Sequence, residues 1–204
     1  FPLVETALQV ALDAGPVLEE QVAVTGLGVV GILTGLMLQR AGARVVGVEP
    51  LAERRATAAA VGLEAVAPDD AAELIAVRAP GGLPLAVETS GRPDVLRDTL
   101  PFLAHEGEAL VVSWYGTKDV HLPLGAEFHR RRLRIRSTQV SSIPAALAGR
   151  WTRDRRRAVV RELLHELPLA PLATHSFPFE QAAEAFAAID RGDAGLVHAA
   201  LCYT

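Results

Sequence analysis

The stretch VAVTGLGVVGILTGLMLQRAGARVVGVEP, from Val22 to Pro50, decides the fold. An apolar run ends in a glycine-rich turn, a helical pattern follows over about 29–41, and a second apolar run over 43–49 ends at Glu49. Apolar runs bounded by turn residues and separated by a helical pattern predict a strand–helix–strand unit with parallel strands. The sequence therefore opens a parallel sheet at this point.

Gly26, Gly28 and Gly31 give the spacing G-x-G-x-x-G where the first predicted strand meets the helix. Gly26 permits a tight turn, Gly28 lets a pyrophosphate approach the backbone, and Gly31 lets the helix pack on the strand. The helix N-terminus presents free N–H groups and the positive end of its dipole to phosphates. The motif predicts dinucleotide binding, and the alternative that the glycines serve packing alone stays open.

Glu49 ends the second predicted strand, where a carboxylate can accept the hydroxyls of an adenosine ribose and repels a 2′-phosphate. This position favours NAD over NADP. Arg54 and Arg55 follow about one helical turn later, where either could contact the ribose, neutralise a 2′-phosphate or simply lie on an exposed helix face.

The alternation of strands and helices continues beyond Pro50. We predict helices over about 51–61, 70–77, 93–104, 153–167 and 178–190, and strands over 63–68, 83–91, 108–116, 121–125, 133–140 and 196–203, with a loop over 141–149. The strand at 121–125 contains Pro123, as an edge strand tolerates. The fold class is therefore α/β, a doubly wound Rossmann parallel sheet with helices on both faces, formed as a single domain over 1–204.

Composition excludes several classes of protein. Half of the 204 residues are hydrophobic, which excludes a disordered chain. The apolar runs are too short to span a bilayer, so we expect no membrane partner. The first residues, FPLVETALQVALDAG, lack both Met and a secretory signal, so a fragment or a processed chain is expected. Cys202 is the only cysteine, which excludes an internal disulfide and fits a cytoplasmic location.

Positive charge gathers in the second part of the chain, in HRRRLRIRS and RWTRDRRRAVVR. Residues 1–125 hold 8 basic and 16 acidic residues, and residues 126–204 hold 12 basic and 8 acidic ones. A basic helix face can follow nucleic-acid phosphates. Here Asp154, Glu162 and Glu166 interleave with the arginines, and no aromatic platform accompanies them. We predict a solvated face and no nucleic-acid partner.

Five stretches together resemble the cofactor-binding half of zinc-type alcohol dehydrogenase-like members of the medium-chain dehydrogenase/reductase superfamily. They are VAVTGLGVVGILTGLMLQRAGARVVGVEP, AVGLEAVAPDD, LAVETSG, LRDTLPFLAHEGEALVVSWYG and THSFPFEQAAEAFAAIDRGDAGLVHAALCY. The resemblance implies hydride transfer between NAD(P) and an alcohol or carbonyl substrate. A non-catalytic dinucleotide-sensing module stays open, and an S-adenosylmethionine-dependent methyltransferase is disfavoured by the three-glycine spacing.

The resemblance also implies a set of cofactor contacts. The pyrophosphate would lie against Gly26, Gly28, Val29, Val30 and Gly31. The adenosine half would lie against Glu49, Arg54, Ser90 and Gly91, and the nicotinamide half against Ser113, Trp114, Ser137 and Thr138. Such dehydrogenases often place a basic residue of the last strand on the pyrophosphate, and here GLVHAALC offers only His198.

In the same family the zinc ligands and the proton relay belong to a GroES-like N-terminal catalytic domain, to which no part of this chain corresponds. We therefore expect no metal site in this chain, zinc only in that preceding domain, and no activity from the fragment alone. Segments 1–20 and 168–204 would adjoin the missing domain. Relatives often pair at the sheet edge predicted at 121–125 and 133–138, so a homodimer is expected. Catalytic residues and the substrate stay unassigned.

Overall fold

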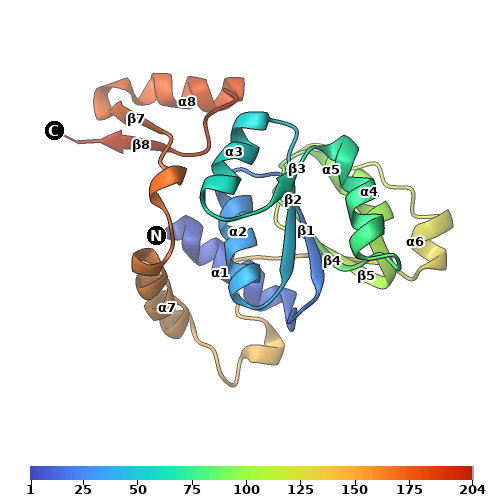
Figure 1. Cartoon of the computed structure of the whole chain (residues 1–204). Helices are drawn as coiled ribbons and strands as arrows, with labels where there is room; N and C mark the ends of the chain where they lie inside the picture. Colours follow the sequence, from blue (N-terminus) through green and yellow to red (C-terminus); the bar gives the residue numbers. More distant parts are fainter. Residues whose placement is uncertain (204) are drawn as a thin grey trace.

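A six-stranded parallel sheet with strand order β3-β2-β1-β4-β5-β6 forms the centre of the computed structural model, which describes residues 1–203 (Figure 1). The strands are β1 (Gln21–Thr25), β2 (Arg44–Val48), β3 (Ala65–Val66), β4 (Leu83–Glu88), β5 (Leu103–Val111) and β6 (Arg134–Ser137). This order, with every pair parallel, confirms the doubly wound Rossmann fold.

Helices cover both faces of the sheet, as the fully apolar strands predict. They are α1 (Pro2–Ala14), α2 (Val29–Arg40), α3 (Ala52–Ala60), α4 (Pro68–Arg78), α5 (Pro93–Thr99), α6 (Ala126–Arg130) and α7 (Arg153–Glu166). Neighbouring strand residues point to opposite faces, so Val22 and Val24 join one buried cluster and Ala23 the other. The first cluster includes side chains of α1, α2 and α7, and the second includes Ile75 of α4 and Leu96 of α5.

The sequence analysis assigns no helix to residues 1–20, where the structure has α1. Its buried residues are Val4, Ala7, Leu8, Gln9 and Val10. The helix packs on α2 and α7, where Arg156 of α7 donates to Glu5 and Gln9 of α1. The first residues are thus an integral part of the folded unit.

Two element predictions were wrong in detail. No strand forms over 121–125, where Pro123 lies in irregular backbone, so the sheet ends at β6 on this side, and β3 is the edge strand on the other. The helix that begins at Pro93 ends at Thr99 and gives way to a short 3₁₀ turn, η1 (Leu100–Phe102), and β5 then begins at Leu103 rather than near 108. Pro101 explains the early end, because proline cannot supply the N–H that a continuing α-helix needs.

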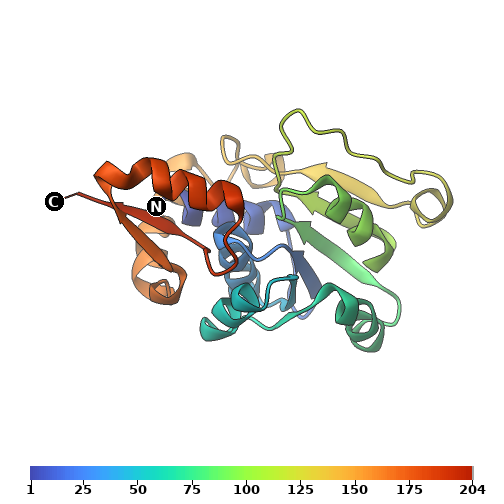
Figure 2. The same ribbon diagram turned by 90° about the horizontal axis from the view of Figure 1, so that it is seen from above.

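The last residues form a separate unit. Strands β7 (His175–Pro178) and β8 (Ala199–Cys202) are connected by α8 (Ala182–Arg191) and pair with each other in parallel. They do not join the central sheet. Figure 2 shows this unit, in red, beside the six-stranded sheet. Cys202 is exposed at the end of β8. Across residues 1–203, no helix has both the length and the apolar composition needed to cross a bilayer.

Candidate functional site

The strands of the central sheet end in register at one edge. Thr25 of β1 pairs with Val48 of β2 and with Glu88 of β4, and Val111 of β5 pairs with Glu88 and with Ser137 of β6. The segments that follow therefore leave the sheet at one height. This carboxyl edge is where doubly wound folds bind their ligands.

Two of the three motif glycines are fixed by close packing. Gly26 has φ of 90°, and a Cβ there would lie 2.5 Å from the Cα of Ser90. A Cβ on Gly31 would lie 2.0 Å from the carbonyl oxygen of Gly26 and 2.6 Å from Oγ1 of Thr89. A side chain at either position would push the glycine turn away from the sheet, so both glycines are required by the fold itself.

Gly28 differs from the other two, because a Cβ built there meets nothing within 4 Å. Gly28 is the N-cap of α2 and no side chain caps that helix end. The first N–H groups of an α-helix have no partner within the helix. Helix α2 thus begins with exposed backbone donors and Val29 and Val30 in its first turn, an arrangement that fits an anionic diphosphate.

Glu49 lies directly beside this turn, as the sequence predicted. Its buried carboxylate accepts the backbone N–H of Leu27 at 2.7 Å through Oε2 and that of Leu51 at 3.1 Å through Oε1. Each carboxylate oxygen can accept more than one hydrogen bond, so acceptor capacity remains for a ligand hydroxyl. The guanidinium of Arg55 is held by the backbone and not by the Glu49 carboxylate, because its Nη1 donates to the carbonyls of Glu49 and Pro50 at 2.7 Å each.

Arg54 faces the N-terminus of α2. It lines a cavity of about 290 Å³ together with Val29 and His198, although His198 lies far along the chain. Its Nη2 donates to the carbonyl of Leu196 at 3.3 Å, while its buried Nε has no hydrogen-bond partner within the described part of the chain. The structure therefore brings Arg54, with its unpaired Nε, and His198 to the start of α2.

The segments after β4 and β5 are joined to each other. The N–H of Gly91 donates to Oγ of Ser113 at 2.8 Å, and the N–H of Ser90 donates to the carboxylate of Glu88 at 2.6 Å. Trp114 projects from this edge with 91% of its surface exposed. Ser90, Gly91, Ser113 and Trp114 thus form one surface beside the glycine turn.

Glu88 is a buried acid at this edge that the sequence analysis did not single out. It is fully buried, and besides Ser90 it accepts the hydroxyl of Tyr115. Burial and the Glu88 carboxylate both raise the pKa of Tyr115 above its ordinary value, so this hydroxyl stays protonated and keeps donating. The sequence carried one signal for these contacts: Glu88 is an acid at the end of an apolar strand, and a carboxylate buried there needs hydrogen-bond donors around it.

Thr138 follows β6 at the same edge. Its N–H donates to the carbonyl of Val111 at 3.0 Å, and its hydroxyl donates to the carboxylate of Asp13 on α1. Ser137 is the last residue of β6. The predicted nicotinamide residues therefore line the edge from β5 to β6, with the Thr138 hydroxyl turned toward α1.

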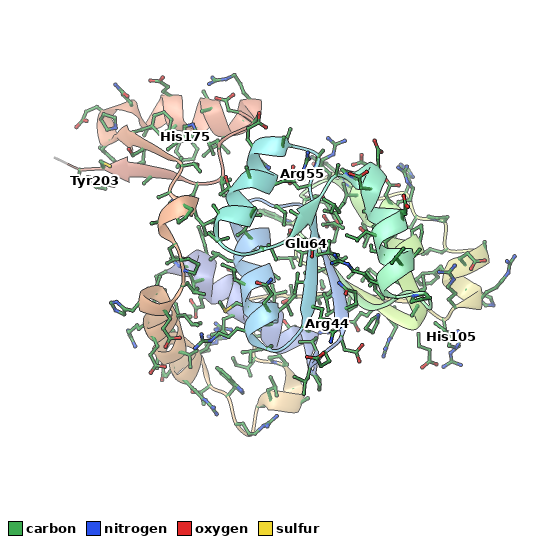
Figure 3. The ribbon with its side chains drawn as sticks, in the orientation of Figure 1. Arg44, Arg55, Glu64, His105, His175 and Tyr203 are labelled. Carbon is green, nitrogen blue, oxygen red and sulfur yellow. The ribbon has the colours of Figure 1, made fainter. Side chains whose placement is uncertain are left out.

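The residues present do not fit a zinc ion. Within residues 1–203, no three His, Cys, Asp or Glu side chains gather closely enough to hold a metal. His105 and His175 lie at opposite ends of the molecule (Figure 3).

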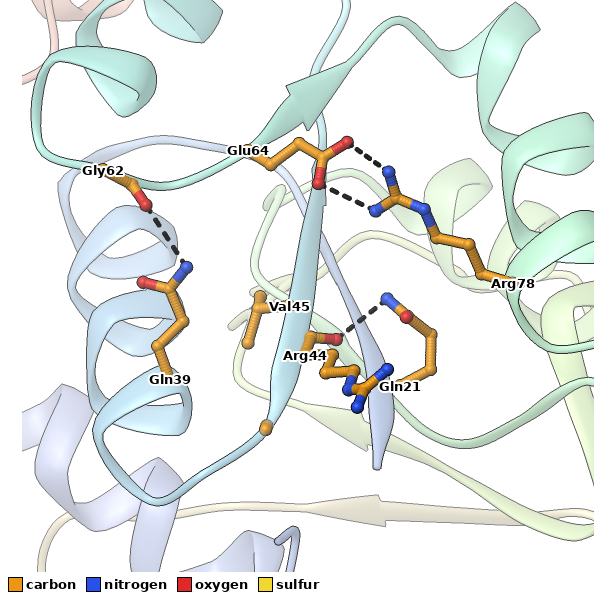
Figure 4. A pocket seen from close by; sticks show the side chains of 8 residues that line it. Gln21, Gln39, Arg44, Val45, Gly62, Glu64 and Arg78 are labelled. Atoms are coloured by element: carbon orange, nitrogen blue, oxygen red, sulfur yellow. Dashed lines mark hydrogen bonds and ion pairs between the residues drawn. The ribbon is translucent and has the colours of Figure 1, made fainter. Parts of the chain in front are cut away.

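A second cavity, of about 620 Å³, lies at the opposite, amino edge of the sheet (Figure 4). Two of its charged side chains neutralise each other, because Arg78 donates to both carboxylate oxygens of Glu64 at 2.7 Å. That pairing lowers the pKa of Glu64 and raises the pKa of Arg78. Arg44 is paired with Glu19. This cavity offers a ligand no unpaired charge.

A doubly wound sheet with an open glycine turn, an acid at the end of β2 and a basic cavity at the start of α2 defines a dinucleotide-binding Rossmann domain. Residues 29–153 match the family model described as zinc-binding dehydrogenase. The chain belongs to this family, the zinc-type alcohol dehydrogenase-like branch of the medium-chain dehydrogenases/reductases, and corresponds to its cofactor-binding portion.

Among curated relatives, D-guloside 3-dehydrogenase of Escherichia coli K12 is 32% identical over 157 residues, which cover 74% of this chain and 45% of that protein. L-threonine 3-dehydrogenase of Saccharopolyspora erythraea is 27% identical over 190 residues, which cover 89% and 51%. The chain thus spans about half the length of the curated relatives it matches.

Solved structures share the fold. The crystal structure of 2R,3R-butanediol dehydrogenase from Bacillus subtilis matches 97% of this chain and 55% of that one, with a TM-score of 0.75 and 23% identity. A short chain alcohol dehydrogenase from E. coli CFT073, complexed with NADH, matches 98% of this chain and 57% of that one, with a TM-score of 0.77 and 16% identity.

Proposed function

We propose that this chain binds NAD as the coenzyme domain of an oxidoreductase that transfers a hydride between the nicotinamide and an alcohol or carbonyl substrate. The observation that carries the proposal is the open backbone at Gly28 next to the fixed carboxylate of Glu49. The family supports the type of reaction. When bound, the coenzyme supplies the hydride chemistry, and this chain binds and orients it.

The pyrophosphate would be held by the free N–H groups at the start of α2, between Gly26, Gly28 and Gly31 and the side chains of Val29 and Val30. Arg54 and His198 line the adjoining cavity, where Arg54 would add positive charge beside the phosphates and His198 could donate a hydrogen bond. Ser90 and Gly91 would lie near the adenosine, and Ser113, Trp114 and Thr138 near the nicotinamide, because these segments share the carboxyl edge.

We propose NAD rather than NADP because Glu49 is held in place by two backbone donors and would repel a 2′-phosphate. Arg55 supports the same choice, since backbone carbonyls already hold its guanidinium.

Titration of the chain with NADH, NADPH and S-adenosylmethionine tests this proposal, with binding followed by fluorescence or calorimetry. We expect NADH to bind at least about tenfold more tightly than NADPH. Glu49→Gln should weaken NADH binding and narrow that difference, while Glu64→Gln at the amino edge should leave both unchanged. Binding of S-adenosylmethionine without any response to NADH would contradict the proposal.

A catalytic domain would pack on α1 and on the unit of β7, α8 and β8, that is, on segments 1–20 and 168–204. Two strands rarely suffice for an independent sheet, and Phe186 and Ile189 of α8 are 67% and 51% exposed. The relatives have about twice the length of this chain. We propose that zinc, the proton relay and the substrate site belong to that domain, that the fragment alone is inactive and that the protein works in the cytoplasm.

Strand β6 is an edge strand with one unpaired side, so we propose that two copies pair there as a homodimer. Light scattering at micromolar concentration checks this proposal. The mass of a dimer is expected, and a monomer would contradict it.

A further inference from the structure

Glu88 occupies the point where the segments of the carboxyl edge meet. It ends β4 between the glycine turn after β1 and the segment after β5. Its side chain is fully buried, so it is closed to a ligand, yet both carboxylate oxygens are used. A buried carboxylate is costly unless donors surround it, and here the donors come from Ser90, at the proposed coenzyme site, and from Tyr115, the residue after Trp114.

One carboxylate oxygen of Glu88 holds the turn on the adenosine side of the proposed coenzyme site. Oε1 accepts the N–H of Ser90 at 2.6 Å and also accepts its hydroxyl. The backbone of Ser90 in turn lies against the glycine turn, since a Cβ on Gly26 would reach its Cα at 2.5 Å. The position of Ser90 thus limits the position of Gly26.

The other oxygen holds the nicotinamide side. Oε2 accepts the hydroxyl of Tyr115, and the Glu88 carbonyl accepts the N–H of Val112 at 2.8 Å and that of Ser113 at 3.2 Å. Trp114 lies between two tethered residues and is itself open to solvent. The tethers therefore fix the backbone that carries the exposed indole.

We propose that Glu88 is a positioning residue that holds the turns on both sides of the coenzyme in one arrangement, acting through Ser90 and Tyr115 without touching the coenzyme. A surface ordered before binding loses less entropy when the ligand arrives. This inference rests on the proposed binding of NAD. Oε1 of Glu88 holds Ser90 on the adenosine side, and Oε2 holds Tyr115 on the nicotinamide side. Loss of the Tyr115 contact should therefore weaken binding of the nicotinamide half without weakening binding of the adenosine half.

Paired titrations with NADH and ADP-ribose test the proposal, because ADP-ribose lacks the nicotinamide. Tyr115→Phe should weaken NADH binding about tenfold, the loss typical of one hydrogen bond to a charged group, while ADP-ribose affinity changes by less than about twofold. Ser90→Ala should weaken both ligands, and so should Glu88→Gln. In a Trp151→Phe background Trp114 is the remaining tryptophan, and Tyr115→Phe should lower its fluorescence anisotropy without any ligand.

Leu83→Ala is the control for general destabilisation, since Leu83 is buried at the opposite end of the same strand. It should lower the thermal midpoint while the ratio of the two affinities stays at the wild-type value. The inference is overturned if Tyr115→Phe binds both ligands as the wild type does, or loses both equally as a loosened fold would. If the wild type binds neither ligand, the proposed function fails as well. Should Glu88→Gln not fold, the other two variants still decide.

Discussion

The two ends of the central sheet are built from the same strands and differ in what they leave unpaired. The cavity at the amino edge is the larger, about 620 Å³ against about 290 Å³, but its Glu64 and Arg78 satisfy each other. At the carboxyl edge, the start of α2 is uncapped and Nε of Arg54 is buried without a partner in residues 1–203. Unpaired donors, and not volume, distinguish the carboxyl edge from the amino edge.

The largest effect should come from Gly31→Ala, because the new methyl group would lie 2.0 Å from a backbone oxygen that cannot move freely. We expect a loss of about 3 kcal/mol or more in the free energy of unfolding, measured by urea denaturation. Gly35→Ala in the same helix is the matched control and should cost less, since the atoms nearest to its methyl, at 2.7 and 2.9 Å, are the ends of the Leu63 side chain and not backbone. Equal stability of both variants would show that the turn is not held as described.

Gly28→Ala separates binding from folding. Its methyl group meets no protein atom within 4 Å, so the free energy of unfolding should change by less than about 1 kcal/mol. The same methyl would occupy the space proposed for the pyrophosphate, and NADH affinity should fall about a hundredfold. Gly81→Ala, equally open but at the amino edge, should leave NADH titrations unchanged. Unaltered NADH binding by Gly28→Ala would place the coenzyme elsewhere.

Arg54→Met tests the role of the Arg54 guanidinium, whose Nε has no hydrogen-bond partner in residues 1–203. Methionine keeps an apolar stem but removes the charge and the buried Nε that has no partner. Without ligand, the free energy of unfolding of this variant should therefore differ from that of the wild type by less than about 1 kcal/mol. NADH affinity should fall about tenfold when a phosphate loses this partner. A variant that binds NADH normally would assign Arg54 to packing alone.

The smallest effect should come from Glu64→Gln at the amino edge. Arg78 lowers the pKa of Glu64 from its ordinary 4.5, so the pair stabilises the fold above that pH and the contribution disappears as the pH falls through the lowered value. Both side chains are partly exposed, so at pH 7 the loss should stay below about 1 kcal/mol. Urea denaturation at pH 7 and near pH 3 checks this, and a difference that grows in acid would contradict the assignment.

Much of this arrangement could be predicted from the sequence. Apolar strands that alternate with helices predict parallel strands covered on both faces, and the glycine spacing predicts the turn before α2; the structure confirms both. These features are local, since a few neighbouring residues determine each of them.

The remaining features depend on contacts between distant parts of the chain. The role of Glu88 rests on Tyr115, and the environment of Arg54 rests on Leu196, 142 residues away in sequence. The strand predicted at 121–125 failed for a similar reason: Leu122 packs on the core, but Leu124 is exposed and the segment pairs with no strand of the sheet. Spacing alone does not show which side chains meet at a sheet edge.

The common height at which the strands end has a thermodynamic consequence. Residues near positions 28, 49, 90 and 114 are adjacent only after the sheet has formed, so a molecule that spans them has no counterpart surface in the unfolded chain. Such a ligand raises the free energy of unfolding by an amount set by its free concentration relative to Kd, about 2.7 kcal/mol at a hundredfold excess. Saturation with dinucleotide would therefore protect the whole sheet against heat and proteolysis.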